Sequence, residues 1–258
     1  MQRYFVKAES FNEHSVTLEG DDAHHLVRVM RMKPGDEIIV SDGEGREAVA
    51  KLSGLAPGRV EADILELRPV SGEPGWSVTV AQALPKGDKM ELVIQKGTEI
   101  GAAAFVPFQS ERMVVQYDER KEGKRLERWR KIAKEAAEQA HRSIIPAVRP
   151  VLGWRGLVAS LAQYDSVFFC YEKEGGLSGS GLRDAVRAAA SQAADPSSLK
   201  LLVIVGPEGG FTEREASEAE AAGAVTVGLG KRILRTETAA MVALACLMYE
   251  SGEMGGST

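Results

Sequence analysis

The pattern of hydrophobic and polar positions divides the chain into two parts. From the start to about residue 68, apolar residues occur in short alternating or β-branched runs. Turn sequences rich in glycine, proline and aspartate separate these runs, for example Lys33–Asp36 and Ser41–Gly45. Several short strands at close spacing predict a small β-barrel. The predicted strands are Tyr4–Val6, Ser15–Leu18, Glu37–Val40, Glu47–Leu52 and Val60–Leu67.

One helix is predicted between the barrel strands. Asp21 or Asp22 can cap it, and three basic residues follow at positions i, i+4 and i+7, which share one face of an α-helix. This face is either an ordinary solvated surface or a contact for nucleic-acid phosphates. The basic face consists of His24, Arg28 and Arg31, and the apolar side of Leu26, Val29 and Met30.

Residues 68–75 mark the boundary between the two parts. Two prolines and two glycines within this short stretch are typical of a linker. Beyond it, strands alternate with helices, which predicts an α/β domain whose parallel sheet has helices on both faces. We therefore expect a barrel domain over residues 1–70 and an α/β domain over residues 76–258. The expected strands of the second domain are Ser77–Leu84, Ala104–Phe108, Ser166–Cys170, Leu201–Val205 and Val225–Leu229, and its helices begin near Asp88, Lys124, Ala185 and Thr212.

The predicted helix Lys124–Arg142 carries many charges on its outer face. Lys131 and Lys134 each have a glutamate four residues further on, so these charges are expected to pair on a solvated surface. Arg142 has no such partner within the helix. It is therefore a candidate, although a weaker one, for contact with a nucleic acid.

Two strands near the C-terminal end each lead into a loop that contains glycine. Gly206–Gly210 follows the first strand, and Gly230 follows the second. In open α/β sheets, ligands bind at the carboxyl ends of strands, where glycine lets the backbone come close to them. Neither loop fits the G-x-G-x-x-G or P-loop pattern. The loops are thus either tight turns or a ligand site. Their charged residues include Glu208, Arg232, Arg235 and Glu237.

Helix-start signals follow both glycine loops. Thr212 with Glu215 three residues later is a capping box, and Thr236 can cap the last helix. From Ala239 to Met248 this last helix has no charged side chain. A helix that is apolar all round is buried on all sides. One domain of this size cannot cover a terminal helix completely, so we expect a subunit interface there.

Composition narrows the class of protein. The chain is 44% hydrophobic and 27% charged with a net charge of −5, which suits a globular protein and disfavours one that coats nucleic acid without specificity. Cys170 and Cys246 lie in apolar runs, which predicts buried, reduced thiols in the cytosol. No residues have metal-ligand spacing, no signal peptide is evident, and no apolar run has the length of a membrane span. We expect a cytoplasmic protein.

Long motifs in both glycine loops carry a family resemblance. The sequences GPEGGFTEREA and LGKRILRTETAA closely resemble motifs of the SPOUT methyltransferases, in particular the RsmE-type enzymes. Tyr4-Phe5, His24–Arg31, Lys86–Gly101 and Glu135–Gln139 resemble that family's signatures in the same order, so the resemblance spans the chain. It implies a trefoil-knotted α/β domain with an N-terminal PUA-like β-barrel. It also implies a homodimer with the cofactor loops near its interface.

The resemblance further implies the reaction. RsmE-type enzymes use S-adenosyl-L-methionine to methylate N3 of a uridine in small-subunit (16S) ribosomal RNA. Backbone groups and apolar side chains of the loops would hold the cofactor, although the apolar ones could equally be ordinary core. RNA contacts are expected from the barrel face, with Arg142 as an addition. The expected cofactor-binding residues are Tyr171, Glu172, Gly206, Pro207, Glu208, Gly209, Leu229, Gly230, Arg232, Ile233, Leu234, Thr236, Glu237, Thr238 and Ala239.

The chemistry of this reaction needs a cation near the uracil ring. Loss of the N3 proton leaves negative charge on the ring oxygens, which a fixed cation would stabilise. Arg235 is the candidate for this catalytic role, and its alternative is a salt bridge to Glu208 or Glu237. The proton acceptor stays open, because Glu99, Glu138 and Glu208 all lie in family-like motifs and none has a spacing that marks a base.

Two other classes of function compete with this interpretation. One is a non-catalytic RNA-binding factor that uses the α/β domain only to dimerise, and a related alternative is a methyltransferase of another RNA. The other is a nucleotide-dependent enzyme that acts on a small metabolite. The glycine loops disfavour the binding factor, since a scaffold has no need of them. The barrel and the missing phosphate-binding patterns disfavour the metabolite enzyme.

Overall fold

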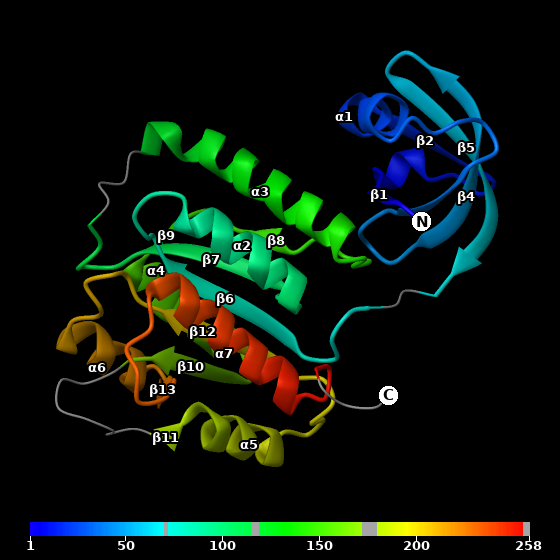
Figure 1. Ribbon diagram of the computed structural model, residues 1–258. Helices are drawn as coiled ribbons and strands as arrows, with labels where there is room; N and C mark the ends of the chain where they lie inside the picture. The colour runs from blue at the N-terminus through cyan, green and yellow to red at the C-terminus, as the bar shows by residue number, and fades with distance from the viewer. Residues whose placement is uncertain (70–71, 115–118, 172–179, 255–258) are drawn as a thin grey trace. The chain divides into compact units, whose positions relative to one another are not determined.

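A computed structural model describes residues 1–69, 72–114, 119–171 and 180–254 (Figure 1). The chain forms two compact units. The first comprises Met1–Glu73 and Lys134–Ile145, and the second comprises Pro74–Ala133 and the chain from Pro146 onward. The first unit thus takes in residues 134–145, which a division at the linker leaves in the second domain. Sequence patterns reveal linkers but not the return of a distant segment.

The first unit is a five-stranded sheet with the order β1-β3-β4-β5-β2. Strands β1 and β3 are parallel, and the other neighbours are antiparallel. Register shifts in the β4–β5 pair interrupt the ladder, and such bulges bend a sheet around its core. Apolar residues from all five strands form this core, as a small barrel requires. The strands are β1 (Arg3–Phe5), β2 (Ser15–Glu19), β3 (Glu37–Ser41), β4 (Glu47–Ala56) and β5 (Arg59–Arg68), and a 3-10 turn spans Ala8–Ser10.

The helix between the barrel strands differs from its prediction. α1 (Gly20–His24) has Glu19 at its N-cap, and it continues into a π-helical turn, His25–Val29. Leu26 is buried, but the side chains of Val29 and Met30 are exposed. A π-turn has more residues per turn than an α-helix, so the spacing of an α-helical face does not hold across it. The expectation that Val29 and Met30 line the buried side is wrong.

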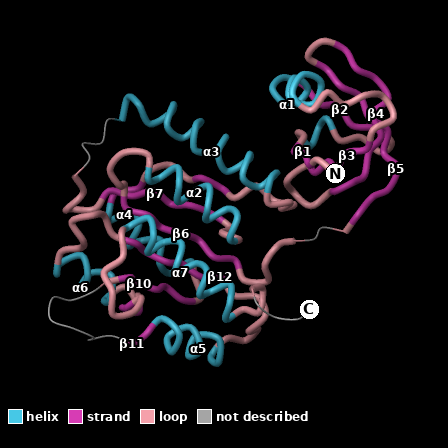
Figure 2. The backbone as a smooth tube through the Cα atoms, viewed as in Figure 1, coloured by secondary structure: helices cyan, strands magenta, loops and turns pink. Residues whose placement is uncertain are grey.

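The second unit contains a parallel sheet with the order β11-β13-β10-β12-β6-β7-β8, and β9 pairs with β7. Figure 2 draws the strands in magenta. Because the strands are parallel, their carboxyl ends meet at one edge. The five strands predicted for this domain are confirmed as β6, β7, β10, β12 and β13. The strand bounds are β6 (Ser77–Ala83), β7 (Ala104–Gln109), β8 (Ala147–Val148), β9 (Leu152–Gly153), β10 (Ser166–Cys170), β11 (Ser180–Gly181), β12 (Lys200–Val205) and β13 (Val225–Gly228).

Helices cover both faces of this sheet. On one face α2 and α7 lie side by side, and α7 also contacts α5, β6 and β12 (Figure 1). On the other face α4 and α6 bury Trp154, Leu157, Ala216 and Ala219 against alternate strand residues. The helices are α2 (Lys89–Ile100), α3 (Glu122–Gln139), α4 (Trp154–Ser160), α5 (Leu182–Gln192), α6 (Glu213–Ala221) and α7 (Thr236–Glu250), with 3-10 turns at Glu119–Lys121 and Leu161–Gln163.

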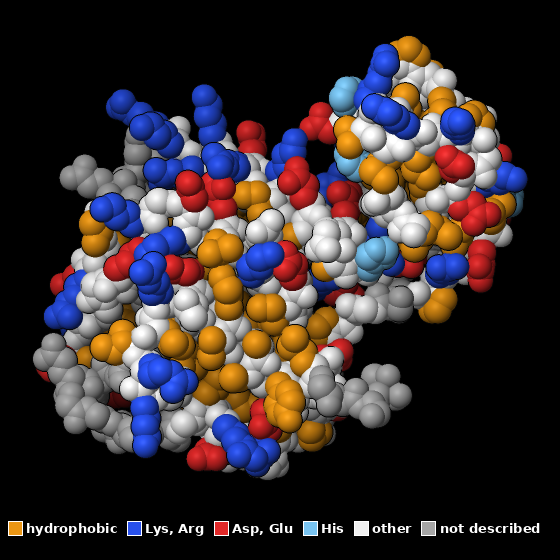
Figure 3. Space-filling view, viewed as in Figure 1, with side chains coloured by type: hydrophobic (Ala, Val, Ile, Leu, Met, Phe, Trp, Pro, Cys, Tyr) orange, Lys and Arg blue, Asp and Glu red, His pale blue; other side chains and the backbone are white. Residues whose placement is uncertain are grey.

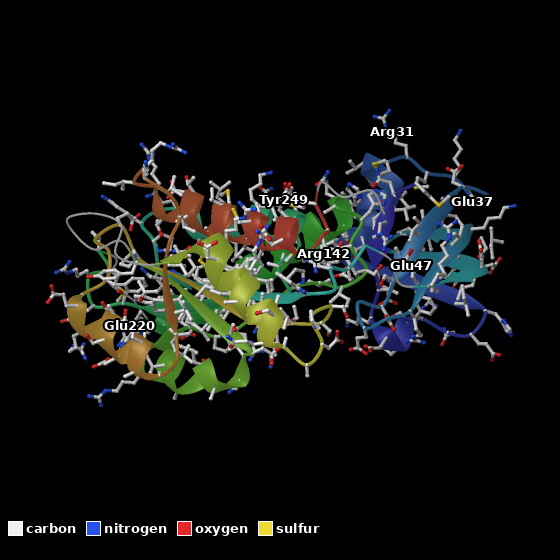
Figure 4. All side chains as sticks on the ribbon, turned by 90° about the horizontal axis from the view of Figure 1, so that it is seen from below. Arg31, Glu37, Glu47, Arg142, Glu220 and Tyr249 are labelled. Atoms are coloured by element: carbon white, nitrogen blue, oxygen red, sulfur yellow. The ribbon has the colours of Figure 1, made fainter. Side chains whose placement is uncertain are left out.

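The last helix is buried on one face only within this chain. Ala243, Leu244 and Leu247 pack into the core, whereas Tyr249 is 64% exposed and Cys246 is exposed. Hydrophobic side chains gather over α7 on the surface in Figure 3, and Tyr249 is labelled on this helix in Figure 4. The prediction that Cys246 is buried is wrong. Cys170 is only partly accessible, and desolvation by burial raises its pKa to about 12.

Arg142 lies beyond the end of α3 and is buried in the first unit, with 4% of its surface exposed. Its Nη2 atom donates to Glu73 Oε2 at 2.5 Å. Nearby, Arg3 Nη1 donates to Glu47 Oε2 at 2.5 Å and to the carbonyl oxygen of Arg142 at 3.1 Å. Figure 4 labels Glu47 and Arg142. The expectation of an unpaired, accessible Arg142 is wrong, because its partner is distant in sequence.

Candidate cofactor site

A pocket of about 1380 Å³ opens at the carboxyl edge of the parallel sheet. It lies where the ends of β10, β12 and β13 meet, which is the usual place for ligands in an open α/β sheet. Both predicted glycine loops line it, and so does the end of β10 at Cys170 and Tyr171. The expected cofactor-binding residues that line the pocket are Tyr171, Gly206, Pro207, Glu208, Gly209, Leu229, Gly230, Arg232, Ile233, Leu234, Thr236 and Ala239.

Two of the predicted residues do not line the pocket, and a third is not described. Glu237 and Thr238 belong to the first turn of α7, but neither lines the pocket. Glu237 is 9% exposed, and its Oε2 atom lies 3.4 Å from Lys89 Nζ. Glu172 lies outside the described residues. Direct cofactor contact is therefore not supported for Glu237 and Thr238.

The glycines of the two loops serve different physical needs. A β-carbon on Gly206 would lie 2.9 Å from the Phe211 ring, and one on Gly209 would lie 2.7 Å from the Arg112 carbonyl oxygen. These two glycines therefore permit close packing within the protein. Gly230 has a φ of +109° and open space where a β-carbon would stand. There the backbone itself can face a ligand, as a cofactor cradle requires.

Glu215 joins the first glycine loop to the segment that follows β7. It is fully buried, and the capping box with Thr212 is confirmed. Its Oε2 atom accepts from Thr212 N–H at 2.9 Å, while its Oε1 atom accepts from Ser110 Oγ and from Glu111 N–H, each at 2.9 Å. A buried carboxylate is stable only when hydrogen bonds replace its water, and these donors supply them.

Glu208 is held by a lysine that the sequence pattern did not single out. Its Oε1 atom accepts from Lys89 Nζ at 2.7 Å and from Lys86 N–H at 3.1 Å. Burial alone would raise the pKa of Glu208, but the hydrogen bonds and the charge of Lys89 outweigh it, so the pKa lies below its usual value. The same hydrogen bond raises the pKa of Lys89. Glu208 is thereby weakened as a proton acceptor.

The other two candidate proton acceptors are Glu99 and Glu138. Glu99 pairs with Lys96 on α2 at 2.8 Å. Glu138 belongs to the first unit, where it accepts a hydrogen bond from Phe5 N–H at 3.1 Å. Burial is the main cause that raises the pKa of Glu138. Neither residue lines the pocket.

Thr236 ties the two glycine loops and the sheet together. Its hydroxyl donates to the Gly206 carbonyl oxygen at 2.5 Å and accepts from Gln82 Nε2 at 2.8 Å. The N-cap of α7 is Arg235, so the expectation of Thr236 at the cap is wrong by one position. The hydroxyl is engaged by tertiary partners, which helix-start patterns do not include.

Arg235 is exposed and lines the pocket. Glu208 and Glu237 are paired with Lys89, and no ion pair of Arg235 is found among the residues that the structure describes. The salt-bridge alternative for Arg235 is therefore not supported. Its neighbour Ile233 is 90% exposed, so in this chain alone it forms part of the surface and not of the core.

Several pocket residues were not expected. Lys89, Arg112, Phe211 and Arg214 line the pocket but belong to segments outside the two glycine loops or just beyond them. Phe211 follows the first loop directly and stacks among Phe108, Trp154 and Phe169. Lys89 directly follows the predicted start of α2, a position that gave no chemical signal. Only the sheet topology brings it to this edge.

The predicted RNA-contact residues of the barrel belong to the first unit. His24, Arg28 and Arg31 are all exposed, and Arg31 projects outward in Figure 4. Arg31 follows the π-turn with a φ of +54°, which directs its side chain differently from a helical residue. Within the described residues, no group of acidic, histidine and cysteine side chains could hold a metal ion, and no helix has the length and hydropathy of a membrane span.

Family models match both units of the chain. The RNA methyltransferase domain matches residues 72–248, and the RNA methyltransferase PUA domain matches residues 18–65. The chain therefore belongs to the RNA methyltransferase family. This finding confirms the SPOUT-type α/β domain and the PUA-like barrel that the sequence motifs implied.

Individual relatives place the chain more closely within that family. It is 41% identical over 259 residues to the ribosomal RNA small subunit methyltransferase E of Bacillus subtilis (strain 168), with 99% of both chains covered. A crystal structure of the same enzyme from Neisseria gonorrhoeae, bound to S-adenosyl methionine, has a TM-score of 0.82 and 32% identity, covering 98% of this chain and 99% of that one. A putative methyltransferase from Legionella pneumophila with bound cofactor SAM has a TM-score of 0.84 and 29% identity, covering 97% and 98%.

Proposed function

We propose that this protein uses S-adenosylmethionine to methylate small-subunit (16S) ribosomal RNA at N3 of a uridine. One observation carries the proposal. The glycine-lined pocket stands at the carboxyl edge of the sheet, in a chain that aligns along its full length with small-subunit methyltransferases. The substrate is a component of the bacterial ribosome, which implies a cytoplasmic location.

The residues of the pocket fit this cofactor. Backbone groups around Gly230 face open space, and Leu229 and Leu234 offer apolar contact for an adenine. Thr236 and Gly206 hold the two loops in register through their 2.5 Å hydrogen bond. When bound, S-adenosylmethionine supplies a methyl group on a sulfonium ion.

Arg235 is the proposed catalytic residue. Its guanidinium has no competing carboxylate within the described residues, so it is available to uracil oxygens as they gain charge. Its place between the second glycine loop and α7 puts it beside the proposed cofactor. Positioning of the two reactants supplies much of the rate in such an in-line transfer.

We propose that the barrel binds RNA through the turn that carries His24, Arg28 and Arg31. All three are exposed, and arginines contact phosphates well because their donors form a planar fork. The adjacent Val29 and Met30 are exposed apolar side chains, which suit contact with an unstacked base. The family match of this unit to a PUA domain supports the same role.

We propose that the protein is a homodimer and that the outer face of α7 forms its interface. Tyr249 and Cys246 are exposed on that face, in a helix that has no charged side chain from Ala239 to Met248. Exposed apolar surface of this kind typically marks an interaction site. The interface would lie next to the cofactor pocket, since Thr236 and Ala239 of the same helix line that pocket.

We also propose the trefoil knot of the SPOUT fold. α7 follows β13, and β10 and β12 separate β13 from β6. Nevertheless α7 packs on β6, β12 and α2. This return supports passage of the last segment through a loop. A crystal structure whose backbone would extend into a straight line, without a knot, when pulled at its two ends would contradict the proposed knot.

Mass spectrometry of 16S ribosomal RNA tests the function. A deletion strain should lack one N3-methyluridine, and the unmutated gene should restore it. Arg235→Ala should bind S-adenosylmethionine in calorimetry and should fail to restore the modification. Arg155→Ala removes an exposed arginine of α4 that does not line the pocket, and this variant should restore the modification fully. Persistence of the modification in the deletion strain would overturn the proposed substrate.

A further inference from the structure

The segment after β7 lies against the first glycine loop. Arg112 Nη1 donates to the Phe211 carbonyl oxygen at 3.5 Å, a long bond, and the Arg112 backbone occupies the space that a β-carbon of Gly209 would need. Ser110 and Glu111 are held by the buried Glu215. The three residues 110–112 are therefore held against the pocket by Gly209, Phe211 and Glu215.

A capping box alone does not explain the burial of Glu215. Such a glutamate needs only to reach back to the N-cap, and its second oxygen can stay in water. Here the second oxygen accepts both bonds from the 110–112 segment, and the side chain is fully buried. The arrangement gives this carboxylate a second task, which is to hold Ser110 and Glu111 beside the loop.

The cations around the pocket fall into two groups. Lys89 and Arg214 are neutralised, since Lys89 pairs with Glu208 and Arg214 pairs with Glu111 and Glu218. The second group lines the same pocket, and no ion pair of its members is found in the described part of the chain. This second group consists of Arg112, Arg232 and Arg235.

Glu111 interacts electrostatically with Arg112 but forms its ion pair with Arg214. Arginines without an ion pair of their own that converge on one pocket favour an anionic ligand. The chain as a whole has a net charge of −5, so this local excess of positive charge runs against its average. A single cofactor carboxylate would need at most one of these arginines. All three are exposed, so they can reach a large ligand outside the pocket. A polynucleotide offers repeated phosphates at such a rim.

We propose that Arg112 contacts a phosphate of the RNA beside the target nucleotide, that Arg232 contributes to the same site, and that Glu215 is the positioning residue that holds Arg112 there. This rests on the proposed function, and it adds an RNA contact in the transferase unit to those of the barrel. Arginine is suited to this role because its forked donors match phosphate oxygens.

Arg112→Gln tests the contact, with Arg155→Gln as the matched control. One lost phosphate contact lowers the slope of log K against log salt by about 0.7 for single strands, which corresponds to roughly fivefold weaker RNA binding at 0.1 M salt. The affinity for S-adenosylmethionine, measured by calorimetry, should not change. A loss of cofactor affinity with RNA binding intact would assign Arg112 to the cofactor carboxylate and overturn the proposal. An unchanged salt slope would overturn it too.

A double-mutant cycle tests the positioning role. Ser110→Ala removes one of the donors to Glu215 Oε1 and leaves the capping box in place. It should raise KM for RNA and leave kcat near the unmutated value. In the Arg112→Gln background the same change should have little further effect, because both act through one contact. Fully additive effects on KM would show that Ser110 and Glu215 do not act through Arg112.

The same assays separate this inference from the proposed function. If the unmutated protein transfers no methyl group to ribosomal RNA, the proposed function fails first. If the unmutated protein is active and Arg112→Gln matches it in KM and salt dependence, only the inference about Arg112 fails.

Discussion

A β-carbon on Gly209 would stand 2.7 Å from the backbone carbonyl oxygen of Arg112. Real β-carbons do not approach a carbonyl oxygen so closely, so residue 209 must be glycine for the two segments to meet. The first glycine loop is thus shaped in part by the protein's own backbone. The cofactor is not the only reason for its glycines.

Gly209→Ala should therefore separate the loop from residues 110–112. Relief of the clash requires a backbone shift, which costs about 1–3 kcal/mol in free energy of unfolding. Urea unfolding measures this cost, and calorimetry should show weaker S-adenosylmethionine binding. Gly123→Ala is the control and should cost no stability, since Gly123 is exposed in α3 and a β-carbon there meets open space. Equal stability of the two variants would contradict the close approach.

The ion pair of Lys89 and Glu208 should make stability depend on pH at the acid end. The pKa of Glu208 is lowered, so its stabilisation is present above its unfolded value of 4.5 and is lost as pH falls through the folded value. The pKa of Lys89 is raised above 10.5, so its contribution persists up to alkaline pH. The side chains are 29% and 28% exposed, which limits the effect to about 1 kcal/mol.

Lys89→Met tests this pair. The variant should lose stability at pH 7, and the loss should shrink as pH falls through the lowered pKa of Glu208 and its carboxylate becomes protonated. Lys96→Met is the control, because it removes a lysine from the Lys96–Glu99 pair on the same helix and leaves the pocket intact. A stability difference that stays constant as pH falls from 7 until the protein unfolds in acid would exclude the proposed linkage.

The two faces of α7 should respond differently to substitution. Tyr249→Glu places a charge on the exposed face and should yield a folded monomer in sedimentation. Leu244 is 1% exposed, so Leu244→Ala should instead cost about 2–5 kcal/mol in unfolding free energy. A monomeric unmutated protein that is fully active would refute the dimer.

The buried pair Arg3–Glu47 should be sensitive to loss of one partner. The two side chains are 4% and 2% exposed, and Arg3→Met leaves the Glu47 carboxylate buried without a cation. Removal of one partner from such a pair costs about 3–5 kcal/mol. The double variant Arg3→Met/Glu47→Met should recover part of this cost. Arg59→Met, in an exposed pair of the same sheet, should change stability by less than about 1 kcal/mol.

The sequence by itself determined the local elements. Alternating apolar runs predicted the barrel strands, and continuous apolar runs predicted the buried parallel strands, because side-chain periodicity follows directly from burial. The two glycine loops and the Thr212–Glu215 capping box were also predicted, since their signals lie within a few residues. Those loops contained most of the residues that line the pocket.

Only the tertiary structure decided the partners of distant residues. Arg142 was expected at the surface and is buried on Glu73, and Thr236 was expected as a cap and bonds to Gly206. Lys89 and Arg112 reach the pocket because the sheet order places β6 beside β12 and β7 beside β6. No periodicity encodes strand order, because it results from the packing of all elements together. The sequence therefore predicted the two glycine loops of the pocket. Only the fold showed that Lys89 and Arg112 line the same pocket.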